Sequence, residues 1–216
     1  YDMTSSLVGS EMCIRDRHNA WIVTDEVYEH LLFDQARHIP IATLPGAAER
    51  TISISSAGKT FSTTGWKIGW AQGPADAITA ILSVKQFLTF VNGAPFQPAI
   101  AVGLRLGDDF YAEIASVLQR KRDILVEGLQ QAGFRVFSPS GAYYVLADTT
   151  PLGYDDATAL SRQLPERAGV VGIPATAFTR PEHAGRFRSL IRFAFCKRED
   201  CLLYTSDAAD ELDGVD

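Results

Sequence analysis

Lys59 follows TISIS at 51–55, a run of alternating polar and apolar residues that is typical of a β-strand. Ser56 stands between this run and the lysine, and the residues after Lys59 are rich in Ser, Thr and Gly. A lysine amine attacks aldehydes when it is neutral and attracts anions when it is charged. The position therefore predicts a ligand that needs an amine at the end of a strand.

A second group of reactive side chains lies upstream, at the end of the apolar run AWIVTD at 20–25. This run predicts a buried parallel strand that ends in Asp25, and Tyr28 follows three residues later. Ligands of α/β sheets bind beyond the carboxyl ends of the strands. We therefore expect Asp25 to face the same crevice as Ser56 and Lys59.

One cofactor suits this set of side chains, namely pyridoxal 5'-phosphate. Lys59 would bind the cofactor aldehyde covalently, and Asp25 would keep the pyridine nitrogen protonated so that the ring withdraws electrons. Tyr28 would donate a hydrogen bond to the ring oxygen. Ser56 and Lys67 would bind the phosphate, with Lys67 acting as a point charge.

A nucleotide site is the competing interpretation, because Gly58-Lys59-Thr60 matches the end of a P-loop. The rest of the pattern is missing. A P-loop needs glycine where Ser53 stands, and Gly65-Trp66 interrupts the helix that should begin at the lysine. The acidic strand also precedes the loop here, whereas it normally follows. These misses weigh against a nucleotide.

The elements that must position these residues indicate an α/β domain followed by a smaller α+β domain, with a junction near Gly107. Apolar spacing and turn residues predict strands, helices and turns in this order: a strand at 68–73, a helix at 75–91 packed on the sheet, a shorter helix at 98–106, a long amphipathic helix from 107–109 to Gly133, two strands around a Pro-Ser-Gly turn at 135–148, a helix at 155–166, and a strand at 189–195.

The two ends of the chain can be encoded by complementary DNA sequences. If Met12–Asp16 is back-translated, the reverse complement read in a shifted frame gives the residues Cys201–Thr205. Natural protein ends have no reason to do this, and both stretches look like translated transposon-based sequencing adaptors. We therefore interpret 1–17 and 201–216 as not native and base the fold on 18–200.

Charge and composition narrow the class of protein. The two ends hold eight of the 26 acidic side chains and two of the 20 basic ones, so the remainder is electrically balanced. Nucleic-acid binding would need clustered Lys and Arg, and a membrane span would need about 18 consecutive apolar residues; neither is found. Cys196 is the only cysteine of 18–200, which fits a reducing compartment, so we expect a cytoplasmic protein.

The stretches VTDEVYEHLLFD, SSAGKTFSTTGWKIGW, GAPFQP and LIRFAFCKRED occur in that order. Together they resemble the class I/II aminotransferases of the type I pyridoxal-phosphate fold, most of all the kynurenine and N-succinyldiaminopimelate aminotransferase branch. The resemblance implies that Lys59 binds the cofactor covalently and carries the substrate proton. It also implies that Arg192 binds the substrate α-carboxylate, for which a planar guanidinium is suited. Lys67 stands where many aspartate-type relatives have arginine.

The resemblance implies an arrangement of domains and an activity. Residues 18–107 would be the C-terminal half of the large, mostly parallel-sheet cofactor domain, and 108–200 the small C-terminal α+β domain. The implied reaction is transamination between an amino acid and a 2-oxo acid, in a homodimer in which FVNGAPFQP at 90–98 resembles a stretch that approaches the cofactor of the neighbouring subunit. The upstream half of the family pattern is absent, so we expect an incomplete enzyme.

Several alternatives remain open from the sequence. The same cofactor could support β-elimination from cysteine conjugates, or the chain could be a non-catalytic regulator domain. Taken singly, Asp25 could cap the segment after it, and Arg192 could form a structural ion pair. Tyr28, Tyr143 and Tyr144 could be ordinary residues at the edge of a core. The four histidines have no ligand-like spacing, so no metal is assigned.

Overall fold

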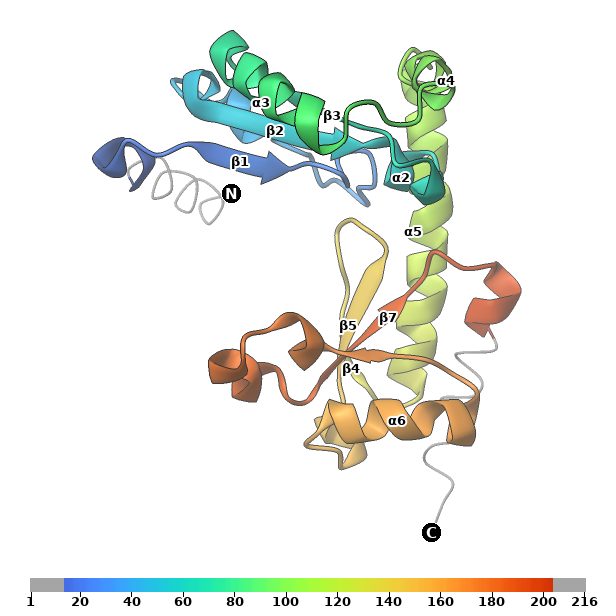
Figure 1. Ribbon diagram of the computed structural model, residues 1–216. Helices are drawn as coiled ribbons and strands as arrows, with labels where there is room; N and C mark the ends of the chain where they lie inside the picture. The colour runs from blue at the N-terminus through green and yellow to red at the C-terminus, as the bar shows by residue number, and fades with distance from the viewer. Residues whose placement is uncertain (1–13, 204–216) are drawn as a thin grey trace. The chain divides into compact units, whose positions relative to one another are not determined.

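The chain forms two units in a computed structural model that describes residues 14–203 (Figure 1). The first unit runs to His30 and resumes over Arg37–Tyr111. The second unit comprises Leu31–Ala36 and the chain from Ala112 onward. Each unit has its own sheet and is described by itself.

The sheet of the first unit has three strands in the order β1-β2-β3. These are β1 (Ile22–Asp25), β2 (Thr51–Ser56) and β3 (Gly69–Gln72), which confirms the three predicted strands. The predicted burial of β1 is wrong for the described residues, because its side chains alternate between partly buried and exposed. β1 and β2 are parallel, whereas β2 and β3 are antiparallel, so only one of the two pairs follows the predicted parallel arrangement. The connection from β2 to β3 is short and lacks the long crossover helix that parallel neighbours need.

The helices of the first unit are α2 (Ala57–Thr60), α3 (Ala75–Leu88) and α4 (Phe96–Gly103), with short helical turns η1 (Ile41–Thr43), η2 (Ala48–Arg50) and η3 (Thr64–Trp66). α3 forms as expected beside β2 and β3, but none of its side chains is buried (Figure 1). Phe87 and Leu88 are 83% and 77% exposed. The helix itself is confirmed, but the expected burial of its apolar side chains is wrong for the described residues, because the described chain leaves them exposed.

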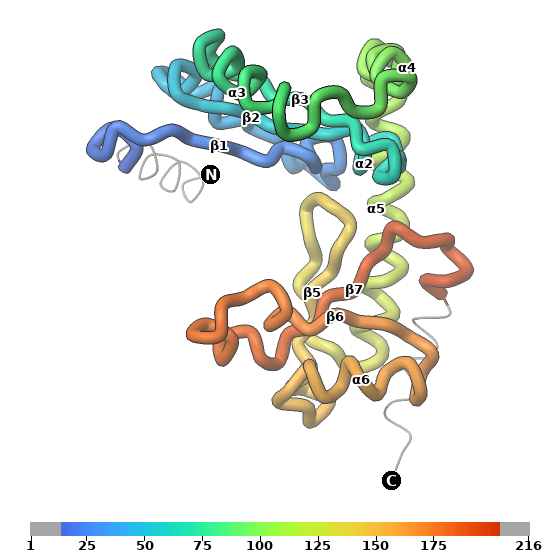
Figure 2. Tube along the Cα trace, in the orientation of Figure 1, coloured from blue at the N-terminus to red at the C-terminus, as the bar shows by residue number. Residues whose placement is uncertain are grey.

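The second unit has a four-stranded antiparallel sheet in the order β4-β5-β7-β6. Its elements are β4 (Arg135–Phe137), β5 (Tyr144–Asp148), η4 (Thr150–Leu152), α6 (Ala157–Ala168), β6 (Ile173–Pro174), η5 (Ala175–Phe178), η6 (Pro181–Phe187) and β7 (Leu190–Ala194), after the long helix α5 (Asp108–Gln131). Figure 2 shows the chain leaving the sheet after β6 in a long excursion before it returns as β7. η5 and η6 lie in this excursion.

One apolar core holds the second unit together. α5 contributes Leu125 and Leu129, and α6 contributes Leu160 and Leu164, all at most 2% exposed. The inward-facing side chains of the sheet complete the core, because alternate residues of a strand point to the same face. The apolar face of each of the helices α5 and α6 thus packs against the apolar face of the sheet.

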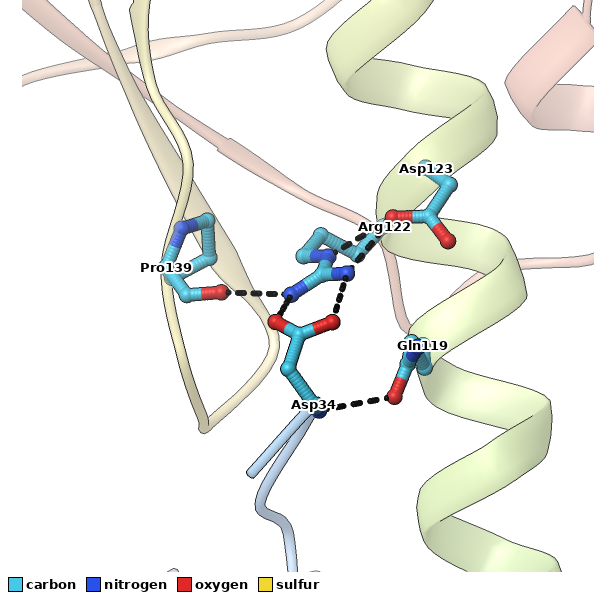
Figure 3. A network of polar contacts seen from close by, with 5 residues as sticks. All are labelled: Asp34, Gln119, Arg122, Asp123 and Pro139. Carbon is cyan, nitrogen blue, oxygen red and sulfur yellow. Dashed lines mark hydrogen bonds and ion pairs between the residues drawn. The ribbon is translucent and has the colours of Figure 1, made fainter. Parts of the chain in front are cut away.

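The short segment Leu31–Ala36 is fixed to the rest of the second unit by polar contacts (Figure 3). The guanidinium of Arg122, which is 7% exposed, donates to both carboxylate oxygens of Asp34 at 2.7 and 3.2 Å and to the Pro139 carbonyl at 3.1 Å. The backbone N–H of Asp34 donates to Gln119 Oε1 at 3.0 Å. The Arg122 hydrogen bond lowers the pKa of Asp34, and the Asp34 carboxylate raises the pKa of Arg122.

The stretches interpreted as foreign, 1–17 and 201–216, lie mostly outside the described residues. Of the part that is described, Arg15 donates to the carbonyl of Gly46 at 2.9 Å, and Leu202 packs in the core of the second unit. Within 14–203, no helix is both long enough and apolar enough to cross a membrane.

Candidate functional site

Lys59 lies on α2, a single helical turn that begins directly after β2. β2 is the central strand of its sheet, and its alternation of β-branched and small residues fits a half-buried strand. The backbone N–H of Ala57 donates to the carbonyl of Ile68 at 3.0 Å, and that of Phe61 donates to Ala57 at 3.0 Å. The first bond continues the pairing of β2 with β3, and the second closes the single turn of α2. A P-loop requires a long helix at this place, and α2 is only four residues long.

A cavity of about 290 Å³ lies beside this turn. Three of the predicted site residues, Ser56, Lys59 and Lys67, line it. Its volume is near the lower end of the roughly 300–1000 Å³ range of small-molecule sites. The remaining lining comes from Gly58, Thr64, Ile68 and Gly69. The structure thus brings two hydroxyl-bearing residues, Ser56 and Thr64, and two lysines to one cavity.

The wall of the cavity opposite Lys59 is held close by small residues and by an unusual backbone conformation. A Cβ atom added to Gly58 would lie 3.2 Å from Thr64 Cα, so glycine allows η3 to approach α2. Lys67 has φ of 55°, in the left-handed region. The side-chain amide of Asn92 donates to the Lys67 carbonyl at 2.6 Å and stabilises this conformation. The next residue, Ile68, is buried and anchors the wall.

Asp25 ends β1, the parallel neighbour of β2, and is paired in register with Ile54. Ile54 lies two residues before Ser56, so Asp25 and Ser56 are on the same face of the sheet. Asp25 is exposed and is not among the residues that line the cavity of Lys59, so the expectation that it faces the same crevice as Ser56 and Lys59 is not met by this cavity. Its Oδ1 accepts the backbone N–H of Val27 at 3.1 Å, which is the capping contact that the sequence allowed as an alternative. Tyr28 is half-buried in the turn that follows.

Polar contacts fix this turn to the strands next to it. Ser55 donates to Glu29 Oε1 at 2.7 Å, and His30 Nδ1 lies 3.3 Å from the hydroxyl of Thr60, the residue after Lys59. The His30 ring stacks on Tyr111 at 4.2 Å between centroids. Burial raises the pKa of Tyr111, and the carboxylates of Glu29 and Asp108 raise it further. The turn that carries Tyr28 is therefore tied to the helix that carries Lys59.

Arg192 belongs to the second unit, on β7. Its Cζ lies 4.0 Å from the ring centroid of Tyr144 and 3.9 Å from that of Phe178. Among the described residues no carboxylate lies within ion-pair distance of Arg192, and its buried Nε has no hydrogen-bond partner there. The structural ion pair that the sequence left open is thus not found in the part that the structure describes.

The residues that line the cavity beside Lys59 fit pyridoxal phosphate in their chemistry. A phosphate dianion needs cations and hydroxyl donors, which Lys67 and Ser56 provide, and an aldehyde needs a primary amine, which Lys59 provides. Asp25 offers a carboxylate on the adjoining strand end, on the face shared with Ser56. In residues 14–203, no group of three or more His, Cys, Asp or Glu side chains could hold a metal ion.

Some contributors to these sites could not be found by sequence reasoning. Thr64 and Gly69 line the cavity, and only the general richness of this stretch in Ser, Thr and Gly pointed to them. Asn92 acts through the backbone of a residue 25 positions away. Phe178 lies at the end of a short helical turn and reaches Arg192 only because β6 and β7 pair. No motif marks such contacts.

The chain is similar to known proteins in both sequence and structure. The pattern of the family "Aminotransferase class I and II" matches residues 12–201. The chain is 50% identical over 190 residues to the probable N-succinyldiaminopimelate aminotransferase DapC of Mycobacterium tuberculosis, covering 85% of this chain and 48% of that protein. It is 39% identical over 197 residues to the kynurenine–oxoglutarate transaminase of Dictyostelium discoideum, covering 83% of this chain and 45% of that protein.

Solved structures agree with the sequence matches. The N-succinyldiaminopimelate aminotransferase of M. tuberculosis superposes with a TM-score of 0.91 at 47% identity, over 96% of this chain and 54% of that one. The chain spans about half the length of the curated relatives that it matches. The family pattern covers most of the sequence, including the strand ends that carry Asp25, Ser56 and Lys59. The chain therefore belongs to the class I and II aminotransferase family.

Proposed function

We propose that this chain carries the cofactor-binding lysine and the carboxylate-binding arginine of a pyridoxal-phosphate-dependent aminotransferase, which transfers an amino group between an amino acid and a 2-oxo acid. The observation that carries the proposal is the cavity shared by Ser56, Lys59 and Lys67 at the end of the central strand. Pyridoxal phosphate is the cofactor of this family, and when bound it supplies an electron-withdrawing ring that stabilises negative charge at the substrate α-carbon.

Each residue has a distinct task in this proposal. Lys59 would hold the cofactor through Nζ and would move the proton at the substrate α-carbon. Asp25 would pair with the protonated ring nitrogen, and Tyr28 would donate a hydrogen bond to the ring oxygen. Lys67, together with Ser56, binds the phosphate.

Arg192 binds the substrate α-carboxylate in this proposal. Its lack of any ion-pair partner among the described residues supports the assignment, because an arginine placed for structural reasons would be expected to have one. A guanidinium offers parallel N–H donors that match the two oxygens of a carboxylate. Arg192 would thus orient the substrate, whereas Lys59 would perform the proton transfer.

We also propose that 18–107 belongs to a large cofactor domain and 108–200 to a small C-terminal domain, with 1–17 and 201–216 foreign to both. The complete protein would act as a cytoplasmic homodimer. Exposed apolar residues in FVNGAPFQP support the dimer: Phe90 is 75% exposed, Val91 58% and Phe96 39%. Exposed apolar clusters of this kind are typical of interaction surfaces. Sedimentation of the complete protein, with and without Phe90→Ser, would test this part.

Covalent trapping tests the central assignment without relying on turnover. The chain would be incubated with pyridoxal phosphate, reduced with borohydride and mapped by peptide mass spectrometry. We expect the added mass on the peptide that contains Lys59, and we expect Lys59→Ala to abolish it. Lys197→Ala is the matched control, because Lys197 is exposed and lies in the second unit. Equal labelling of Lys197 and Lys59 would contradict the proposal.

Turnover requires the half of the relatives that this chain does not span. Co-expression with the upstream half of the mycobacterial relative would supply it, and amino-donor-dependent formation of a 2-oxo acid would then be measured. Release of pyruvate from cysteine conjugates without an acceptor acid would instead indicate β-elimination. The relatives are named as aminotransferases and transaminases, so neither elimination nor a regulator role is favoured.

A further inference from the structure

The aromatic rings beside Arg192 come from opposite sides of its strand. β7 lies between β5 and β6 in the sheet. Tyr144 is on β5, where it is a diagonal cross-strand neighbour of Arg192, since Leu146 is the residue paired with the arginine. Phe178 ends η5, which directly follows β6, and Ile173 of β6 is paired with Arg192. The order of strands therefore delivers one ring from each side.

Both rings are close enough to stack on the guanidinium. The two centroid distances from Cζ, 4.0 Å to Tyr144 and 3.9 Å to Phe178, are well within the roughly 6 Å that defines a cation–aromatic contact. All N–H donors of a guanidinium lie in its plane. Because the two rings come from strands on either side of β7, we infer that they cover the two faces of the guanidinium and that an anion reaches Arg192 at the edge of its plane.

The edge of Arg192 retains an unused donor. Its Nε is buried and has no hydrogen-bond partner within residues 14–203. Buried donors are nearly always paired in folded proteins, and an exception needs a physical explanation. A ligand oxygen bound at the edge would provide that explanation.

We propose that Tyr144 and Phe178 form a slot around Arg192 that admits planar carboxylates and rejects tetrahedral anions such as sulfonates. This inference rests on the proposed role of Arg192 in binding the substrate carboxylate. Tyr144 and Phe178 are positioning residues, because they act on the ligand through the arginine. The substrate class at this position is therefore restricted to carboxylic acids, and amino sulfonates of the same size are excluded.

Ring electrostatics explain the discrimination. The face of an aromatic ring carries partial negative charge, which attracts the guanidinium. A carboxylate that binds in the guanidinium plane keeps both oxygens away from the ring faces. A sulfonate has a third oxygen that must leave this plane and approach one of the rings, where the negative charges repel. Removal of either ring should relieve this repulsion.

Nuclear magnetic resonance of the arginine side chains tests the slot directly. The chain would be labelled with nitrogen-15 at arginine, and the Nε–H signal of Arg192 would be assigned with Arg192→Lys. Titration with acetate and with methanesulfonate would give a dissociation constant for each anion. We expect acetate to bind more tightly by about fivefold, the ratio that roughly 1 kcal/mol gives at room temperature.

Three variants separate the slot from simple charge attraction. Phe178→Leu and Tyr144→Leu should each bring the ratio of the two dissociation constants close to one, whereas Tyr144→Phe keeps the ring and should keep the ratio. Phe137→Leu is the matched control, because Phe137 also flanks an arginine in the same sheet, with Arg135 Cζ 5.9 Å from its ring. The Arg122 signal reports whether each variant has folded around Asp34.

The outcomes distinguish this inference from the proposed function. If acetate does not shift the Arg192 signal, Arg192 is not a carboxylate site, and both the slot and its role in the proposed function are wrong. If acetate binds but the wild-type chain does not discriminate, or the leucine variants discriminate as well as the wild type, the slot alone is wrong. If one of the three slot variants lacks the Arg122 signal of the folded chain, the ratios of dissociation constants of the other two decide whether the slot exists.

Discussion

The two units differ sharply in how they bury apolar surface. In the second unit, sixteen buried residues form one continuous cluster that joins α5, α6 and the sheet. Among the residues that the structure describes in the first unit, the corresponding cluster has only Ala57, Ile68 and Ile100 as buried members. The cavity with Lys59 thus belongs to the unit with the smaller core.

This difference shows that reactive residues and stabilising core need not be provided by the same part of a chain. The first unit exposes large apolar side chains, among them Val23 on β1 and Phe87 and Leu88 on α3. Because apolar burial is the main favourable term in folding, we expect the second unit to hold most of the stability measured for this chain. The first unit should gain stability when its apolar surface is covered.

The largest effect on the free energy of unfolding should come from shortening a side chain in the core of the second unit. Leu129→Ala removes a side chain that is fully buried on α5 and should destabilise the second unit by about 2–5 kcal/mol. Leu88→Ala makes the same chemical change on α3, where the side chain is 77% exposed, and should change stability by less than about 0.5 kcal/mol. Urea unfolding followed by circular dichroism would measure both. Equal effects would refute the contrast between the units.

Overpacking should have the next largest effect. A Cβ atom at Gly172 would lie 2.5 Å from Ile191 Cδ1 and 2.9 Å from Phe193 Cε1, and both side chains are buried. Gly172→Ala should therefore cost about 1–3 kcal/mol. Gly185→Ala is the control, because no atom lies within 4 Å of its added Cβ. A melting temperature unchanged by Gly172→Ala would show that this core is looser than the structure indicates.

Acidification should weaken the second unit in particular. Hydrogen bonds from Arg122 and from Thr158 lower the pKa values of Asp34 and Asp156, respectively. Burial raises the pKa of Asp148, but hydrogen bonds from Thr150 and Ser189 and the charge of Arg135 lower it by more. In the unfolded chain these carboxyl groups have their ordinary pKa of about 3.9, which is higher than their lowered pKa in the folded chain. The unfolded chain therefore takes up protons first as the pH falls, so stability should decrease below about pH 5.

Amide hydrogen exchange between pH 6 and pH 3 would follow this loss unit by unit. Asp148→Asn should flatten the pH dependence of α5 and the four-stranded sheet, because one of the lowered carboxyl groups no longer titrates. Protection that is as strong at pH 3 as at pH 6 would contradict the prediction.

The smallest change in folding stability is expected on α3. Phe87→Ser alters a side chain that is 83% exposed, so the free energy of unfolding should change by less than about 0.5 kcal/mol. Self-association should fall, because an exposed apolar patch on the first unit is removed. Light scattering against concentration would measure this, with Gln86→Ser as the exposed polar control from the same helix. If the scattering of Phe87→Ser does not change, α3 does not contribute to self-association.

Much of the fold follows from periodicity in the sequence. The strands before Asp25 and before Lys59 and the long helix α5 were all predicted, because alternation and helical spacing depend only on nearby residues. The burial of Arg122 was not predicted, since its partner Asp34 is 88 residues away. The exposure of α3 was also missed. A sequence shows that a helix is apolar but not whether the described chain covers it.

The candidate site likewise has residues that the sequence could predict and contacts that it could not. Ser56, Lys59 and Lys67 could be grouped from their place after a strand, and the structure puts all three on one cavity. The flanking of Arg192 by Phe178 could not be foreseen, because it depends on the order of β5, β7 and β6 rather than on any spacing along the chain.

The assignment of Leu31–Ala36 to the second unit limits how this protein can be dissected genetically. A clone that begins at Ala112 would encode the helices and the sheet but would lack Phe33, whose buried ring packs 5.9 Å from that of Phe195. Arg122 would also lose both hydrogen bonds to Asp34 and would keep only Asp123 as an ion-pair partner among the described residues. An autonomous version of this half must therefore supply the hexapeptide in trans or graft it onto one terminus.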